Sequence, residues 1–397
     1  MTKAPSLRAS NRSRVLAELL AGAELERTQL AESTGLSRAT VFRVVDDLIA
    51  SQLLLERSAP LKTGPGRPAT TVRLNPSAML IAGIDLGGTN CRIAVADALG
   101  NAIIRGRFKT PRELGAADFA DWLAARVTEL VDEHGQGIPL GSVALGVPGA
   151  VSGDRKRILG AHNLPQMLGS DFVQAVEDAF DVPVHIDNDS NLALYGELVC
   201  GSLDGSGSAV LLALGTGLGT AAAREGRVLA GPDGALGEFG RLRIPGRAER
   251  LRDLVSGAGL AAYAKSRGAD IDTAEDLFAD PRRHAGILGE VHEALLHLVS
   301  LVTLAYEPAT IVIAGGFADA FEDDILDQLH AEVLDMINVD TRIRRSELGG
   351  AAGLLGAMAA ALSQLHASVG VLTEHATLVQ VERERIIQAL AASPTTA

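Results

Sequence analysis

A polar cluster follows a short apolar run near the middle of the chain, in the sequence HIDNDSN (185–191). A carboxylate such as that of Asp189 can accept the proton of a sugar hydroxyl that attacks a γ-phosphate, and Asn188 can hydrogen-bond neighbouring hydroxyls. Phosphoryl transfer depends mostly on positioning and charge neutralisation, so one well-placed aspartate is enough as the base. The same residues also fit an Asx-rich turn that caps a helix beginning near Leu192, and by itself the cluster favours this structural interpretation.

Three glycine-rich turns, each after an apolar strand-like run, are suited to binding phosphate. Their sequences are DLGGT (85–89), GTGLG (215–219) and AGGF (314–317). Glycine lets backbone N–H groups approach a phosphate, Thr89 adds a hydroxyl, and Asp85 can hold Mg²⁺. The nucleotide-contact candidates are Asp85, Gly87, Gly88, Thr89, Gly215, Thr216, Gly217, Gly315 and Gly316. Strand turns also use glycine without any ligand, so the three turns predict descent from a nucleotide-binding fold rather than present binding.

The segment TQLAESTGLSRATVFRVVDDL (28–48) predicts a helix-turn-helix. Gly35 can take the positive φ that the turn between two helices requires. Ser37 is a good N-cap for the second helix, so that Arg38, Thr40 and Arg43 occupy the exposed side of its first turns. In a recognition helix these side chains face the major groove, where arginine binds guanine edges or phosphates.

The residues after this segment, RSAPLKTGPGRPATTV (57–72), are rich in proline, glycine, threonine and basic residues and predict an exposed loop or linker. Lys62 and Arg67 lie in it, and an arginine between glycine and proline can enter a narrow minor groove. A linker that only needs to be soluble would have the same composition.

Charge and composition support a small DNA-facing end on a large acidic body. Residues 1–75 carry eleven basic and seven acidic residues, whereas the whole chain of 397 residues has a net charge of −13. Two cysteines exclude a disulfide framework and a multi-cysteine zinc site, and 3% aromatic residues are too few for base stacking.

The N-terminus lacks the apolar region of a signal peptide, and the uncharged residues 349–373 predict a packed glycine/alanine helix. We therefore expect a cytoplasmic protein with no membrane partner.

The chain changes from helical to α/β character near residue 78. A weak internal repeat relates IAGIDLGGTNCRIAVADALGNAI (81–103) to AVLLALGTGLGTAAAREGRVL (209–229), which predicts two related lobes facing across a nucleotide-binding cleft. Chance similarity between two β-hairpins would look the same. We expect a DNA-binding domain and linker at 1–75, a first lobe at 76–190 and a second lobe at 191–370. An amphipathic helix at 371–391 is expected to pack back on the first lobe.

Taken together, these motifs resemble the ROK family of repressors, open reading frames and sugar kinases. The resemblance rests on 85–89, GVPG (146–149), Asn163, 188–189, 215–219, GEFG (237–240) and 315–316. It implies an α/β fold in which a winged helix-turn-helix precedes a two-lobed actin/hexokinase-like (ribonuclease H-like) domain. It also implies that Asp189 is the base in the kinases, that the glycine turns contact ATP, and that sugar contacts come from Asn163, Asn188, Asp189 and Glu238.

Two departures from the family pattern concern its zinc loop. The family's histidine after Gly-Glu-x-Gly is here Arg241, and the following RIPGRAERLRDLVSG (243–257) contains no cysteine, so no structural zinc is expected. The family's second sugar-binding glutamate falls on Arg252. Two guanidinium groups could select a phosphorylated or acidic sugar. The alternative, which the sequence favours, is that Arg241 and Arg252 pair with Glu238, Glu249 or Asp253.

These observations predict a sugar-responsive transcriptional regulator, most simply a repressor of carbohydrate uptake or catabolism genes. Its partners would be double-stranded operator DNA and a small sugar or sugar derivative bound in the interlobe cleft. We expect a homodimer or dimer of dimers, because one helix-turn-helix reads too few base pairs. No cofactor is required. The alternative is an ATP-dependent sugar kinase, possibly bifunctional and using ATP and Mg²⁺; a third possibility is a regulator whose cleft is vestigial.

Overall fold

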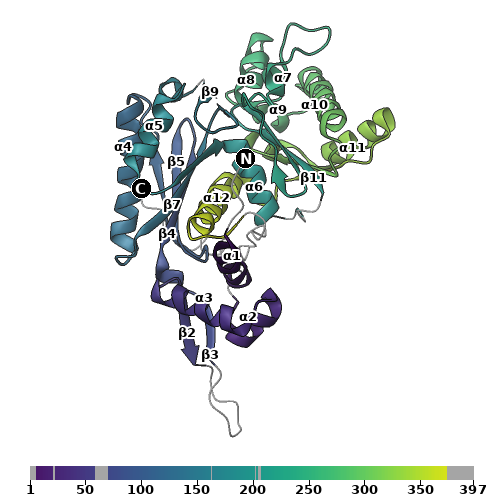
Figure 1. Ribbon diagram of the computed structural model, residues 1–397. Helices are drawn as coiled ribbons and strands as arrows, with labels where there is room; N and C mark the ends of the chain where they lie inside the picture. Colours follow the sequence, from purple (N-terminus) through teal and green to yellow (C-terminus); the bar gives the residue numbers. More distant parts are fainter. Residues whose placement is uncertain are drawn as a thin grey trace. The chain divides into compact units, whose positions relative to one another are not determined.

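The computed structural model describes residues 6–20, 23–58, 70–161, 163–201, 203 and 207–372 (Figure 1). The chain forms two compact units. Unit 1 comprises Met1–Pro148, His162–Ile186 and Ala357–Ala397, and unit 2 comprises Gly149–Ala161 and Asp187–Gly356. The predicted DNA contacts Lys62 and Arg67, and residues 373–391 of the predicted terminal helix, lie outside the described residues.

The N-terminal part of unit 1 combines three helices with a small antiparallel sheet. Its elements are α1 (Leu7–Leu19), β1 (Leu25–Glu26), α2 (Arg27–Thr34), α3 (Arg38–Ala50), β2 (Leu54–Ser58) and β3 (Thr70–Leu74), with strand order β1-β3-β2. Gly35 ends α2 in the left-handed conformation, at φ 67°, where a side chain would be strained. The inward faces of the helices are apolar, and Leu16, Leu30 and Val45 are fully buried. The helices therefore share one small core.

The remainder of unit 1 is a five-stranded sheet covered by helices. Its elements are η1 (Pro76–Ala78), β4 (Leu80–Leu86), β5 (Asn90–Asp97), β6 (Ala102–Lys109), α4 (Ala116–His134), β7 (Leu140–Val147), η2 (Pro165–Met167), α5 (Asp171–Ala179) and β10 (Val184–Asn188). The strand order is β10-β7-β4-β5-β6, in which β4 pairs antiparallel with β5 and parallel with β7. Helices α4 and α5 cover one face and α12 (Ala352–Ser368) covers the other (Figure 1).

Unit 2 contains a second five-stranded sheet. Its elements are β8 (Ala150–Val151), β9 (Ile158–Gly160), α6 (Asp189–Val199), β11 (Ser208–Leu214), β12 (Leu218–Arg224), β13 (Arg227–Val228), η3 (Phe239–Arg241), α7 (Leu251–Leu254), α8 (Gly257–Ser266), α9 (Asp276–Ala279), α10 (Ala285–Tyr306), β14 (Thr310–Ala314), η4 (Gly316–Ala320), α11 (Asp323–Ile337), β15 (Arg342–Arg345) and η5 (Gly349–Ala351). The strand order is β13-β12-β11-β14-β15. Strand β11 pairs antiparallel with β12 and parallel with β14.

The two sheets have the same topology. In each, three consecutive strands form an antiparallel meander, and the first of them pairs in parallel with the fourth. The repeated sequence 209–229 covers the meander β11–β13, and 81–103 covers most of β4, all of β5 and the first two residues of β6. The internal repeat therefore corresponds to a repeated supersecondary structure.

The two units do not follow the continuous segments expected from the sequence. The hairpin β8–β9 belongs to unit 2, where the N–H of Gly153 donates to the carbonyl of Pro232. The C-terminal part of α12 belongs to unit 1, because Met358 packs against Gly83 and Ser142 Oγ donates to the carbonyl of Ala361. The expected lobes, 76–190 and 191–370, place β8–β9 in the first lobe and all of α12 in the second. Local sequence composition does not indicate that these segments pack in the other unit.

Helices α12 and α10 are unusually apolar. The uncharged stretch 349–373 contains α12, most of which is buried, as expected for a packed glycine/alanine helix. Helix α10 is long and apolar enough to cross a membrane by length and composition alone. Its residues Leu295 and Leu298 lie in the core of unit 2, Glu290 and Glu293 on it form ion pairs, and 39% of its apolar window is buried within the fold.

Candidate functional site

The exposed side of α3 carries the residues predicted to contact DNA. The side-chain oxygen of Ser37 accepts a hydrogen bond from the N–H of Thr40 at 3.2 Å, which makes Ser37 the N-cap. Arg38 and Arg43 are exposed and Thr40 is half-buried, while the opposite side of the helix is buried through Val41 and Val45. Two arginines therefore project from the first turns of a helix whose other face fixes it to the core.

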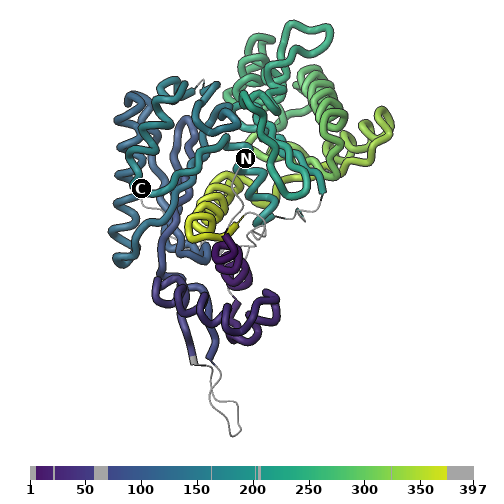
Figure 2. The backbone as a smooth tube through the Cα atoms, in the orientation of Figure 1, coloured from purple at the N-terminus to yellow at the C-terminus, as the bar shows by residue number. Residues whose placement is uncertain are grey.

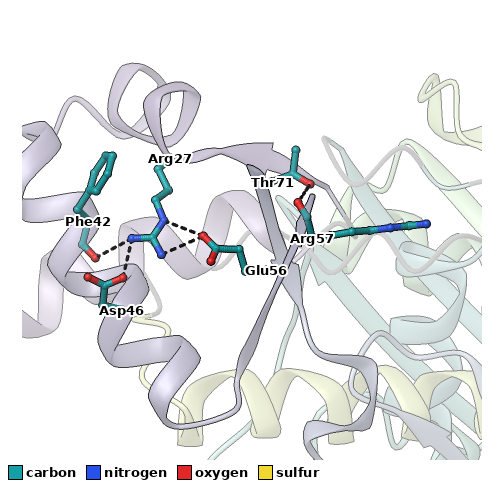
Figure 3. Close-up of polar contacts among 6 residues, drawn as sticks. All are labelled: Arg27, Phe42, Asp46, Glu56, Arg57 and Thr71. Carbon is teal, nitrogen blue, oxygen red and sulfur yellow. Dashed lines mark hydrogen bonds and ion pairs between the residues drawn. The ribbon is translucent and has the colours of Figure 1, made fainter. Parts of the chain in front are cut away.

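Arg27, which no local sequence pattern marks as functional, joins α3 to the rest of the N-terminal part (Figure 3). Its guanidinium lies 2.6 Å from Asp46 on α3 and 3.1 Å from Glu56 on β2, and its side chain is only 16% exposed. It also lies over the ring of Phe42, 5.2 Å from the centroid. No local spacing signals this role, because its partners are brought together only by the tertiary fold.

The first helix contacts the segment that follows α12. Arg12 Nε donates to the carbonyl of Val369 at 3.1 Å, and the N–H of Leu372 donates to Ser13 Oγ at 2.8 Å. Figure 2 shows helix α1 (purple) beside one end of α12 (yellow). Burial lowers the pKa of Arg12, although Asp47 opposes this effect. The last described residues thus touch the three-helix layer that carries α3.

The first glycine turn of unit 1 contains an internal ion pair. Asp85 at the end of β4 faces Arg92 on β5, and the Arg92 guanidinium hydrogen-bonds its carboxylate. Burial raises the pKa of Asp85, and Arg92 opposes this shift. Asn163 lies against the same turn: a Cβ added at Gly88 would stand 3.3 Å from the Asn163 Cβ. The structure therefore brings Asn163 and the glycine turn together, but a guanidinium already neutralises the carboxylate predicted to hold Mg²⁺.

The polar cluster at 185–191 forms a helix cap at the start of α6. Asn188 Oδ1 accepts from the N–H groups of Ser190 (2.9 Å) and Asn191 (3.2 Å), and its Nδ2 donates to the carbonyl of Gly149 (2.9 Å). Asp187 accepts from Arg155 Nη2 at 3.0 Å. Helix α6 begins at Asp189, three residues before the predicted start near Leu192.

Asp189 itself is half-buried at the first position of α6. Its Oδ1 accepts a hydrogen bond from the N–H of Ser190 at 2.7 Å. The capping interpretation therefore describes the contacts of Asn188, and a carboxylate remains at the head of the helix.

Two glycines, Gly149 and Gly160, lie between this cap and the predicted sugar contacts Glu238 and Arg241. Gly149, which accepts from Asn188, is packed against Gly160 so closely that a Cβ would overlap the Gly160 carbonyl. On Gly160 a Cβ would stand 3.3 Å from Arg241 Nη2, and Arg241 Nε donates to Glu238 Oε2 at 2.9 Å. Asn188, Glu238 and Arg241 thus converge within unit 2.

Arg252 joins this group from α7. Its Cβ lies 3.3 Å from the position of a Cβ on Gly240, and its Nε is 3.8 Å from Asp253 Oδ1. Arg241 and Arg252, the two residues that depart from the family pattern, therefore have acidic partners. Arg241 pairs with Glu238 and Arg252 with Asp253, which is the alternative that the sequence favours.

The remaining glycine turns meet at the start of α8. Gly315, at φ 101°, lies against the backbone of Leu214 and Gly215, where a Cβ would come within 2.5 Å of the Leu214 carbonyl. The carbonyls of Gly215 and Thr216 accept from the N–H groups of Gly257 (2.7 Å) and Ala258 (3.3 Å). The turns 215–217 and 315–316 are therefore neighbours, and the loop's own carbonyls already occupy the first N–H groups of α8.

The segment at the position of the family's zinc loop has no side chains suited to binding zinc. Residues 243–257 contain Arg243, Arg247, Arg250 and Arg252 and no cysteine or histidine. The two cysteines of the chain, Cys91 and Cys200, are both buried elsewhere. Thiolate and imidazole ligands are absent from this loop sequence, and four guanidinium groups oppose a divalent cation.

Comparison with known proteins decides the family. A profile described as "ROK family" matches residues 81–364. The chain belongs to the ROK family. Within this family it is 28% identical over 310 residues to a glucokinase of Halalkalibacterium halodurans, an alignment that covers 69% of this chain and 92% of the kinase.

Regulators of the ROK family are also similar to it. The chain is 25% identical over 236 residues to the xylose repressor of Bacillus subtilis, covering 59% of this chain and 60% of the repressor. A crystal structure described as a ROK family transcriptional regulator, homologous to the Escherichia coli MLC protein, superposes with a TM-score of 0.74 at 20% identity. This superposition covers 94% of the chain and 99% of the regulator. The ROK fold is thus shared with kinases and with regulators.

Proposed function

We propose that this ROK protein is a cytoplasmic, sugar-responsive DNA-binding transcriptional repressor of carbohydrate genes. The observation that carries the proposal is the N-terminal part of unit 1, which precedes the ROK match at residue 81 and presents Arg38 and Arg43 on a capped, exposed helix. The superposition with a ROK transcriptional regulator covers 94% of the chain, whereas the glucokinase alignment covers 69% of it.

In this proposal α2, the Gly35 turn and α3 form a helix-turn-helix, and β2 and β3 form its wing. Ser37, Arg38, Thr40 and Arg43 lie at the N-terminal end of α3, the end that enters the major groove in this class of domain. Lys62 and Arg67, between β2 and β3 in the sequence, would add contacts in the minor groove. Two copies of the chain in a homodimer would bind the two halves of a near-palindromic operator.

The effector is proposed to be a sugar or sugar derivative bound by the polar group around the head of α6. Asn188, Asp189, Glu238, Arg241 and Arg252 supply carboxylate, amide and guanidinium groups, and Asn163 is a further candidate in unit 1. Because Arg241 and Arg252 have acidic partners, we expect a neutral sugar rather than an anionic one. The sugar must bind two conformations of the protein with different affinity in order to change DNA binding.

A direct test of the DNA contacts compares Arg43→Ala with Arg14→Ala in gel-shift assays. Arg14 is an exposed arginine on α1 and serves as the matched control. Removal of a base-binding arginine costs about 1–3 kcal/mol, or roughly 5- to 150-fold in affinity, whereas removal of a phosphate-binding arginine lowers the salt dependence by about one ion. Equal DNA affinity of the two variants would argue against α3 as the recognition helix.

The second candidate is an ATP-dependent sugar kinase. It is favoured by the glucokinase similarity and by the carboxylate of Asp189 at the head of α6. The pairing of Asp85 with Arg92 and the occupied N–H groups of α8 count against it. Release of ADP that depends on D-glucose or N-acetyl-D-glucosamine, and that Asp189→Asn abolishes, would establish the kinase; no turnover with these sugars favours the sensor.

A further inference from the structure

The segment that replaces the zinc loop is a short hairpin between two of the proposed sugar contacts. Arg243 and Arg250 form an antiparallel bridge, and the N–H of Ile244 donates to the carbonyl of Glu249 at 3.0 Å. The hairpin connects Arg241 at the end of η3 to Arg252 in α7. Whatever holds this hairpin therefore also sets the positions of the two flanking arginines.

A cluster of four charged residues and one tyrosine around Glu290 ties the hairpin to α8 and α10. We call Arg247, Tyr263, Arg267, Glu290 and Glu293 the Glu290 cluster. Arg247 lies 3.5 Å from Glu290 Oε1 and 2.9 Å from Glu293 Oε2. Arg267 lies 3.6 Å from Glu290 Oε1, and the Tyr263 hydroxyl donates to Glu290 Oε2. One carboxylate thus joins the hairpin, the body of α8 and its C-terminal end.

The surroundings of the cluster strengthen these contacts. The side chains of Arg247 and Glu290 are 25% and 20% exposed, so solvent screens them less than ordinary surface pairs. Burial and the hydrogen bond to Glu290 raise the pKa of Tyr263, which keeps its hydroxyl protonated as a donor. Arg267 also lies over the Tyr263 ring, 5.7 Å from the centroid. The cluster is a connected network rather than an isolated pair.

We propose that the Glu290 cluster replaces the family's zinc as the device that holds residues 238–252, and that Glu290 and Arg247 are positioning residues for sugar binding. The second part rests on the proposed sugar-binding function. A held segment keeps Glu238, Arg241 and Arg252 in one arrangement before the sugar arrives, so less ordering is required on binding. An ionic device differs from a metal in being weakened by salt and unaffected by chelators.

The first measurement is hydrogen exchange of residues 238–256 in the full-length protein. Glu290→Gln keeps the shape of the side chain and removes its charge, and Asp340→Asn is the matched control, because Asp340 pairs with His330 at an exposed site of unit 2. We expect exchange about fivefold faster in Glu290→Gln and in Arg247→Gln, and unchanged in Asp340→Asn. Wild-type exchange should rise in 1 M NaCl and stay constant in EDTA, a comparison that needs no variant to fold.

The second measurement is the dissociation constant, by calorimetry, of whichever of D-glucose, D-xylose and N-acetyl-D-glucosamine binds the wild type. We expect about fivefold weaker binding by Glu290→Gln and no change in Asp340→Asn. Unchanged exchange in Glu290→Gln, or faster exchange in EDTA, would overturn the replacement of zinc. Faster exchange with unchanged sugar affinity would overturn the positioning role. If none of the sugars binds the wild type, the proposed function fails, and the exchange data alone decide whether the cluster holds the segment.

Discussion

Replacement of Arg27 by methionine tests whether this residue positions α3, the proposed recognition helix, or contacts DNA itself. The methionine keeps much of the apolar stem and removes the guanidinium that joins Asp46 on α3 to Glu56 on β2. Each of these ion pairs, with partly exposed carboxylates, contributes about 0.2–1 kcal/mol. The stacking on Phe42 adds roughly 0.5–1 kcal/mol. The N-terminal part should therefore lose about 1–3 kcal/mol of stability.

This destabilisation leaves the domain folded at 25 °C, since domains are stable by about 5–15 kcal/mol. Amide exchange in α3 should increase, and affinity for operator DNA should fall by about tenfold as α3 loses its fixed position. Because the Arg27 guanidinium is engaged with two carboxylates, the dependence of DNA affinity on salt should not change. Arg14→Met, on the exposed side of α1, is the control.

The salt titration gives the result that would refute this reasoning. Removing one cation that binds a B-DNA phosphate lowers the slope of log affinity against log salt by about 0.9. Such a decrease in Arg27→Met, with unchanged exchange in α3, would mean that Arg27 binds DNA directly and does not hold the helix.

Three further predictions concern stability. Ser37→Ala removes the N-cap of α3 and should cost about 1 kcal/mol in urea denaturation, whereas Ser37→Thr should cost much less. Burial lowers the pKa of His366 to about 4, so its neutral form favours the fold and stability should fall by about 2 kcal/mol from pH 7 to pH 5. His366→Phe should reduce this fall, and an unchanged pH profile would contradict the assignment. Arg92→Met leaves the buried Asp85 without its hydrogen-bond donor and should destabilise unit 1 by about 2 kcal/mol, less when combined with Asp85→Asn; equal effects in both backgrounds would contradict the pairing.

The sequence predicted features that depend on local chemistry. The turn at Gly35, the cap at Ser37 and the strand–turn–strand repeat follow from residues close together in the chain, and ROK family membership follows from a series of such short motifs. The sequence 185–191 by itself also favours a helix cap, because asparagine is a preferred N-cap residue.

Features that depend on distant residues were not predicted. Arg27 has partners 19 and 29 residues away, and Arg247 is held by carboxylates on α10 more than forty residues later. Nothing in the spacing of these residues distinguishes them from exposed arginines. The return of α12 to the first sheet likewise depends on a close approach of Met358 to Gly83, which only the fold reveals.

The central claim is tested most directly by a gel shift with the full-length protein and DNA from upstream of its own gene, repeated with D-glucose, D-xylose and N-acetyl-D-glucosamine. We expect retardation at nanomolar protein that weakens with rising salt and that one sugar changes by at least about fivefold. Retardation that no sugar alters would indicate a regulator with a vestigial sugar site. No retardation of this DNA, under conditions in which the protein is folded, would contradict the account.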